Sequence, residues 1–158
     1  MWHKLPTFPA PLRAVLARLP HYPPSAVFAA LLTVELGEHL GAAALPELMG
    51  RKILIKIKDM GVSLCFESGA DGFFACSSDA VDLTITATAE DFLALAQRRE
   101  DPDTLFFSRR LVMEGDTELG LLLKNTLDAL PAHRYTLPEP MRLLRALRLQ
   151  LRVPGWRW

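Results

Sequence analysis

The fold is decided by the stretch DLTITATAEDFLALAQRR at residues 82–99, where an alternating pattern changes into a helical one. Leu83, Ile85 and Ala87 alternate with polar residues, which predicts a half-buried strand with one wet face, as in an antiparallel meander. Thr88 is then a helix N-cap, and Asp91 three residues later completes a variant of the capping box. The stretch therefore predicts a strand followed directly by an amphipathic helix.

The same alternation extends upstream. Residues 53–58 and 62–67 alternate and are separated by Asp59-Met60-Gly61, which predicts a hairpin, and residues 69–72 form a second turn before a strand at 73–77. Further upstream, Ser25 follows two prolines and is expected to cap a helix from residue 26 to about residue 39. Downstream we expect a short helical turn after Asp101, a fifth strand at 111–114, and helices over 117–130, capped by Asp116, and 141–152.

This order of elements predicts an α+β fold, with an about five-stranded, mainly antiparallel sheet and helices covering one face. The chain has 158 residues, 50% of them hydrophobic, which indicates one globular unit able to bury a core. No apolar stretch reaches the length of a membrane span, and the proline-studded N-terminus is not typical of a secretory signal. We therefore expect a cytoplasmic protein.

The charges are unevenly distributed although they sum to zero. Residues 1–24 carry a charge of +3 and residues 132–158 carry +5, so residues 25–131 carry −8. We divide the chain accordingly into a Pro-rich basic N-terminal segment (1–24), a folded body (25–131), and a basic amphipathic C-terminal helix with a Trp-rich tail (132–158). The balanced total argues against a nucleic-acid partner.

The C-terminal segment has the pattern of a helix that lies on anionic lipid. Arginines recur every three or four residues beside a row of leucines, and tryptophans follow. An ordinary surface helix attracted to the acidic body is an equally good interpretation. The predicted membrane-contact residues are Arg142, Arg145, Arg148, Arg152, Trp156 and Trp158.

The motifs of common enzyme classes are missing. There is no nucleophile elbow, and Gly115 and Gly120 have the spacing of a phosphate-binding loop but Leu121 stands where its lysine would be. The four histidines are scattered, so we expect no metal site, no cofactor and no catalytic residue. Cys65 and Cys76 lack zinc-ligand spacing, and we expect them to be reduced thiols in or near the core.

A longer run carries a family resemblance. Residues 101–121 read DPDTLFFSRRLVMEGDTELGL and continue with KNTLDA at 124–129. This run resembles the bacterial sterol carrier protein (type 2) family, in particular its accessory factors of oxygen-independent ubiquinone biosynthesis. The resemblance covers about residues 30–131 and does not extend to either basic end.

The resemblance implies a hydrophobic tunnel between the sheet and its helices. It implies binding of polyprenylated ubiquinone intermediates or phospholipid without catalysis, beside the pathway's anaerobic iron–sulfur hydroxylation proteins. Together with the charge distribution it predicts that the basic ends dock the protein on the anionic inner membrane surface. A phospholipid-trafficking module and a scaffold whose core is filled by its own side chains remain alternatives. The candidate tunnel residues, any of which could instead be plain core, are Phe66, Phe73, Phe74, Leu83, Ile85, Phe92, Leu105, Phe106, Leu111, Met113, Leu119, Leu122 and Leu123.

Overall fold

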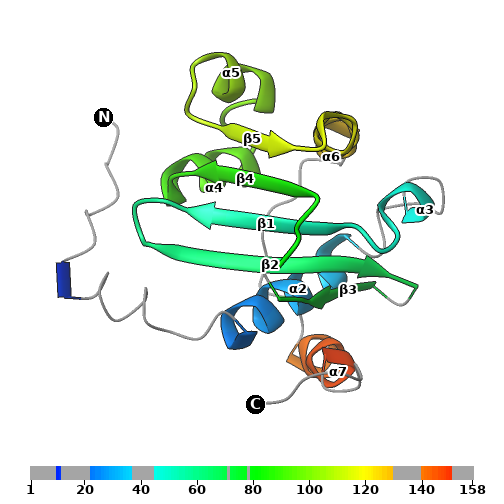
Figure 1. Ribbon diagram of the computed structural model, residues 1–158. Coiled ribbons are helices and arrows are strands. Elements are labelled where there is room, and N and C mark those ends of the chain that lie inside the picture. Colours follow the sequence, from blue (N-terminus) through cyan, green and yellow to red (C-terminus); the bar gives the residue numbers. More distant parts are fainter. Residues whose placement is uncertain are drawn as a thin grey trace.

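The computed structural model describes residues 10–11, 22–36, 45–70, 72–77, 79–129 and 140–150 (Figure 1). It confirms the predicted α+β class and the five-stranded, mainly antiparallel sheet. The strands are β1 (Lys52–Ile57), β2 (Val62–Gly69), β3 (Gly72–Ala75), β4 (Leu83–Ala87) and β5 (Val112–Gly115). The helices are α2 (Tyr22–Leu36), α3 (Leu45–Leu48), α4 (Ala89–Ala96), α5 (Pro102–Phe107), α6 (Thr117–Ala129) and α7 (Pro140–Gln150).

The sheet has the strand order β3-β2-β1-β4-β5, so the predicted meander is wrong for the fourth strand. β4 does not follow β3 in space but pairs with β1 in parallel, while the other three pairs are antiparallel. Asp82 contributes to this pairing, because its backbone N–H donates to the Lys52 carbonyl and its carboxylate accepts from the Lys52 N–H at 2.8 Å. Alternation of side chains predicts which face of a strand is buried but not which strand lies beside it.

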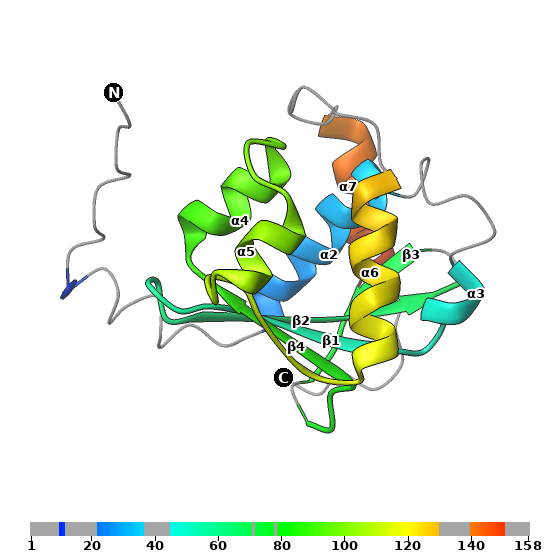
Figure 2. The ribbon, with the colours of Figure 1, turned by 90° about the horizontal axis from the view of Figure 1, so that it is seen from above.

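Helices α2, α4, α5 and α6 lie on one face of the sheet, and α7 packs beside α2 (Figure 2). The main core lies between these layers, where Ile53 and Leu83 from the sheet meet Leu105 and Leu119 from the helices. The inward alternation expected for β4 is confirmed, since Leu83, Ile85 and Ala87 are all buried. The sheet therefore offers one apolar face to the helices, as its sequence pattern requires.

The two cysteines were expected to be reduced, and this expectation is wrong. Cys65 and Cys76 form a disulfide, with Cα atoms 5.3 Å apart, within a small cluster that also contains Leu54 and Val81. The cause is the β2–β3 hairpin, because the pairing of Phe66 with Ala75 places the preceding and following cysteines opposite each other. That separation lies within the range a disulfide can span.

Ser25 is not the N-cap that its position after two prolines suggested. Helix α2 begins at Tyr22, so the two prolines fall in its first turn, where a missing N–H costs little. Ser25 is fully buried, and its Oγ accepts a hydrogen bond from the Cys65 N–H at 3.0 Å. The serine therefore connects α2 to β2.

The outer edge of β3 is covered by two helices. The hydroxyl of Thr33 on α2 accepts from the Phe73 N–H at 2.9 Å. Gln150 on α7 accepts from the Ala75 N–H at 2.8 Å and donates to the Phe73 carbonyl at 2.6 Å. Side chains from α2 and α7 thus satisfy backbone groups that an edge strand otherwise leaves to water.

Candidate functional site

The predicted helix caps set the geometry around the other edge of the sheet. Asp101 caps α5 by accepting from the Thr104 N–H at 2.9 Å, and Asp116 caps α6 by accepting from the Leu119 N–H at 3.0 Å. Gly115 joins β5 to α6 with a φ of 113°, and a Cβ there would stand 2.4 Å from the Asp82 carbonyl oxygen. Only glycine fits this junction, which turns α6 back over the end of β4.

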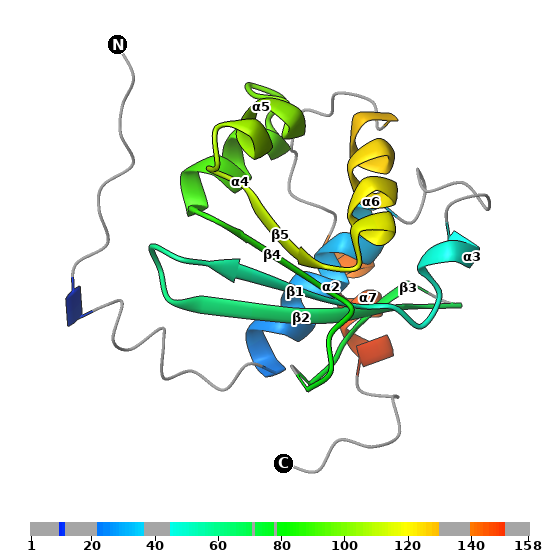
Figure 3. The ribbon, with the colours of Figure 1, turned by 45° about the horizontal axis from the view of Figure 1, so that its top comes forward.

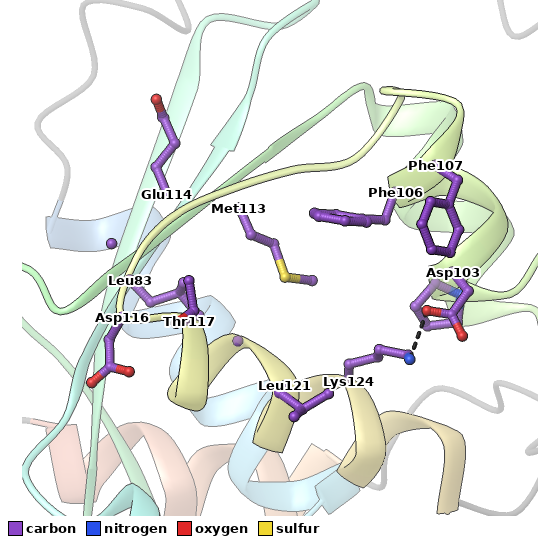
Figure 4. A pocket seen from close by; sticks show the side chains of 13 residues that line it. Leu83, Asp103, Phe106, Phe107, Met113, Glu114, Asp116, Thr117, Leu121 and Lys124 are labelled. Atoms are coloured by element: carbon purple, nitrogen blue, oxygen red, sulfur yellow. Dashed lines mark ion pairs between the residues drawn. The ribbon is translucent and has the colours of Figure 1, made fainter.

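A pocket of about 250 Å³ lies between α5, β5 and the first half of α6 (Figure 4). Its floor contains buried residues, including Leu83 on β4 and Gly120 on α6. Met113 projects into it from β5, and its sulfur lies 3.3 Å from the point where a Cβ on Gly120 would stand. The absence of a side chain at Gly120 is therefore what leaves room at the floor.

The mouth of the pocket is apolar and exposed. Phe106 and Phe107 on α5 are 48% and 80% exposed, and Leu121 on α6 is 56% exposed. All three side chains also line the pocket. We call these three residues the mouth rim. An apolar surface thus continues from the solvent into the interior.

Two ion pairs hold three of the four charged side chains that line the pocket, and the fourth, Glu114, is exposed at the β5 edge. The Lys124 ammonium on α6 lies 2.6 Å from the Asp103 carboxylate on α5, so this pair bridges the two helices (Figure 4). Asp116 pairs with Arg51 on the side away from α5. The Leu119 backbone N–H lowers the pKa of Asp116 below its ordinary value, and the charge of Arg51 acts in the same direction.

The loop that leads from α5 into β5 is fixed to α4. Arg110 pairs with Glu100 at 2.7 Å and with Asp91, whose side chain is buried and also accepts from the Thr88 hydroxyl. The carboxylate of Glu100, followed by that of Asp91, raises the pKa of Arg110. This network stabilises α5 in its position over the pocket.

The structure distributes the predicted tunnel residues over three environments. Leu83, Phe106 and Met113 line the pocket. Nine others belong to the adjoining core, either buried or packed against it: Phe66, Phe73, Ile85, Phe92, Leu105, Leu111, Leu119, Leu122 and Leu123. Phe74 alternates with the buried Phe73, and so faces the other side of β3, where its ring lies close to Gly69.

The predicted membrane-contact residues are described only in part. Arg142, Arg145 and Arg148 are exposed on α7, whereas Arg152, Trp156 and Trp158 lie outside the described residues. Helix α7 buries Ala146 and Gln150 against its neighbours and exposes Met141 and Leu144 beside the arginines. It contacts α2 and β3, so it lies at the opposite edge of the sheet from the pocket.

Several pocket residues were missed from the sequence. Phe107, Gly120, Leu121 and Lys124 all line the pocket but were not among the candidates. Lys124 is the only basic residue between Leu111 and His133, and Gly120 interrupts an otherwise large-residue helix face. The isolated lysine and the isolated glycine both indicate that this helix does more than pack against the core. In the part of the chain that the structure describes, no group of side chains has the makings of a metal site.

A helix-covered sheet with an apolar pocket beneath two of its helices defines an α+β fold of the sterol carrier type. The sequence profile of the SCP-2 sterol transfer family matches residues 30–128, and the chain belongs to this family. The expected family and fold are therefore confirmed.

Curated relatives and solved structures agree with this assignment. The chain is 39% identical over 115 residues to the ubiquinone biosynthesis accessory factor UbiT of Escherichia coli K12, and equally to that of strain O157:H7. The match covers 72% of this chain and 64% of those relatives. The solved structure of a UbiJ-SCP2 ubiquinone synthesis protein shares the fold, with a TM-score of 0.56 and 21% identity over 70% of this chain and 94% of that one.

Proposed function

We propose that this protein is a non-catalytic lipid-binding accessory factor of ubiquinone biosynthesis. The observation that carries the proposal is the 39% identity to a factor named for that pathway, together with an open apolar pocket in the matched region. The pocket holds the apolar part of a polyprenylated intermediate. Its head group stays accessible to the modifying proteins, including the iron–sulfur hydroxylation proteins of the oxygen-independent route.

The charged groups of the pocket support a binding role. Asp103 is paired with Lys124, and Asp116 both caps α6 and pairs with Arg51. A catalytic acid or base needs a reactive proton and a pKa near the working pH. The lowered pKa of Asp116 instead keeps it ionised, so these side chains shape the pocket and fix its helices.

The pocket volume limits how much ligand is enclosed. By proportion to the roughly 150 Å³ cavity that takes up benzene, this pocket holds about ten carbon atoms, or about two isoprene units. The volume also lies just below the range usual for sites that enclose a whole ligand. We therefore expect the pocket to grip one part of a long tail.

The first experiment is mass spectrometry of the organic extract from protein purified without detergent. We expect a stoichiometric prenylated quinone precursor in the native protein and none after denaturation and washing. Phospholipid alone would favour a phospholipid-trafficking module instead. An empty extract, with no uptake after lipid is added, would favour a scaffold and contradict the proposal.

A pocket-filling variant tests whether the extracted lipid was bound in this pocket. Gly120→Leu places a side chain against Met113 on the pocket floor and should lower the amount of bound lipid at least about tenfold, since buried apolar contact of that size is lost. Asn125→Leu places the same leucine side chain on the same helix at an exposed position outside the pocket, and so controls for the added apolar character. Equal loss of lipid in both variants would show that the extract does not come from this pocket.

We further propose that α7 docks the protein on the anionic inner membrane surface from the cytoplasmic side. Arg145 and Arg148 are exposed beside Met141 and Leu144, which is the composition of an interfacial helix face. Each basic residue near such a surface contributes about 1 kcal/mol. The tail residues Arg152, Trp156 and Trp158 belong to the same proposal on sequence grounds.

Vesicle sedimentation tests this docking. Glu substitutions at Arg142, Arg145 and Arg148 should remove the extra pelleting that anionic lipid gives over neutral vesicles, and the native protein's binding to anionic vesicles should fall as salt is raised. Glu substitutions at Lys56, Lys58 and Arg99, which are all exposed and lie outside α7, make the same change in net charge. Unchanged pelleting of the α7 variant contradicts the docking proposal.

A further inference from the structure

The mouth rim is a cluster of exposed, large apolar side chains beside the pocket. Phe107 is four-fifths exposed, and Phe106 and Leu121 are each about half exposed. Such residues are ordinarily tolerated singly on a surface, whereas a cluster beside an open pocket indicates a contact surface. The rim lies on α5 and α6, at the β5 edge of the sheet (Figure 3).

The size of the rim indicates what covers it. Its exposed area is roughly 350 Å², given about 200 Å² for a fully exposed aromatic side chain. A stable protein partner or a second copy of the chain would need about 800 Å² on each side. Insertion into a bilayer has no such minimum, because every apolar side chain that enters the hydrocarbon contributes separately.

The volume of the pocket points to the same occupant. A pocket for about ten carbon atoms leaves the rest of a polyprenyl tail outside it. The apolar lining side chains that are also exposed are those of the rim, whereas the exposed lining residues Glu114 and Thr117 are polar, so an apolar tail leaves across the rim. An apolar tail at that position requires an apolar phase next to it. This step rests on the proposed lipid-binding function.

We infer that the mouth rim inserts into a lipid bilayer and that the pocket opens directly into the hydrocarbon. This contact is separate from the proposed docking by α7. Helix α7 packs beside β3, and the rim lies at the β5 edge. These two strands are four strand spacings apart, roughly 19 Å. The rim contact is apolar and does not depend on anionic lipid, whereas the α7 contact is electrostatic.

Site-specific fluorescence tests this inference. Because Cys65 and Cys76 are joined, a single introduced cysteine gives one reactive thiol for an environment-sensitive dye. The labelled positions are Phe107→Cys on the rim, Leu144→Cys on α7, and Met49→Cys as an exposed control outside the pocket. With vesicles of phosphatidylcholine alone, we expect the emission of the dye at position 107 to shift to the blue. We also expect brominated lipid to quench this emission.

The results separate the alternatives. No response at position 107, or a response only at position 144, overturns the inference. Phe107→Ser should lower partitioning into neutral vesicles at least about tenfold, and Met49→Ser should not, because only the first removes a side chain that enters the hydrocarbon. Equal partitioning of the two serine variants also overturns it.

The outcome is independent of the extract experiment. If the extract holds a lipid but position 107 is silent, the rim inference fails and the proposed function stands. If position 107 responds but the protein neither carries nor takes up lipid, the rim is a membrane contact and the proposed function fails. The fluorescence result therefore tests the rim inference, and the extract result tests the proposed function.

Discussion

At the β3 edge of the sheet, side chains from two helices hydrogen-bond to the outer backbone groups, whereas at the β5 edge the strand is exposed and a pocket opens beside it. Thr33 and Gln150 cover the first edge, and the residues of β3 are buried or half-buried. At the second edge Val112, Glu114 and Gly115 are exposed, and α5 and α6 stand apart enough to leave a cavity. One edge is stabilised by polar contacts across the chain, and the other is left accessible for a ligand.

This difference implies that stability and binding are separable in this molecule. Substitutions at the β3 edge should change the free energy of unfolding and leave lipid binding intact while the protein is folded. Substitutions at the exposed rim should do the reverse. The predictions below test this separation, from the largest expected effect to the smallest.

The largest effect is expected at Leu105, which supports α5 from below. Its side chain is fully buried in the main core, so Leu105→Ala should lower the free energy of unfolding by about 2–5 kcal/mol. Urea unfolding measures the change. Phe107→Ala on the exposed side of the same helix should stay within about 0.5 kcal/mol of the native protein. A comparable loss in both variants would mean that the rim is part of the core.

The covered edge is tested at Gln150. Gln150→Leu keeps the size of the side chain but leaves the Ala75 N–H and the Phe73 carbonyl without this partner, at a cost of about 1–3 kcal/mol. Hydrogen exchange at the Ala75 amide should accelerate by the corresponding factor. Glu114→Leu at the exposed edge is the matched change and should be close to neutral. Unchanged exchange at Ala75 would contradict the role given to Gln150.

The support of α5 is tested at Arg110. Arg110→Met leaves the buried Asp91 carboxylate without its cation and should lower the free energy of unfolding by about 1–2 kcal/mol. Arg109→Met removes the same charge at an exposed neighbouring position and serves as the control. If the two variants unfold at the same urea concentration, the network with Asp91 and Glu100 does not stabilise the loop.

The smallest effect concerns pH. The Leu119 N–H lowers the pKa of Asp116 below its ordinary value of 3.8, so the folded state favours the ionised carboxylate. Its contribution to stability is therefore complete above pH 3.8 and is lost as the pH falls through the lower, folded pKa. Asp116→Asn keeps a capping oxygen without the titration, and its melting temperature should fall less steeply with acid. Parallel pH profiles of both proteins would exclude this contribution.

Most of the elements were predictable because local signals decided them, although Ser25 does not cap α2 and α3 was not predicted. Thr88 and Asp116 cap helices as predicted, Asp101 caps the helical turn expected after it, and the hairpin before β2 follows from Asp59 to Gly61. The parallel pairing of β4 with β1 was not predictable, because it joins segments that are thirty residues apart in the chain, as in the contact of Asp82 with Lys52. A helix cap is recognisable from a few adjacent residues, whereas the identity of a neighbouring strand has no local sequence pattern.

The cysteine pair was within reach of the sequence. The predicted turn at residues 69–72 implies a hairpin register in which Cys65 lies opposite Cys76, and this register, rather than the residue type alone, indicates a disulfide. The candidate site was predicted as a long tunnel, and Phe106, Met113 and Leu83 do line a pocket. The remaining candidates have the same apolar periodicity but lie in the core. The sequence pattern of an apolar face is the same whether that face contacts the core or a cavity, so periodicity alone could not separate the two groups.

Every residue that lines the pocket lies between Leu83 and Lys124, in one uninterrupted part of the chain. Neither α2, β2, β3 nor α7 contributes to it, although they form much of the surrounding framework. The shape of the pocket is therefore encoded in some forty consecutive residues, although the same stretch also supplies core residues such as Leu105 and Leu119 that pack against the framework.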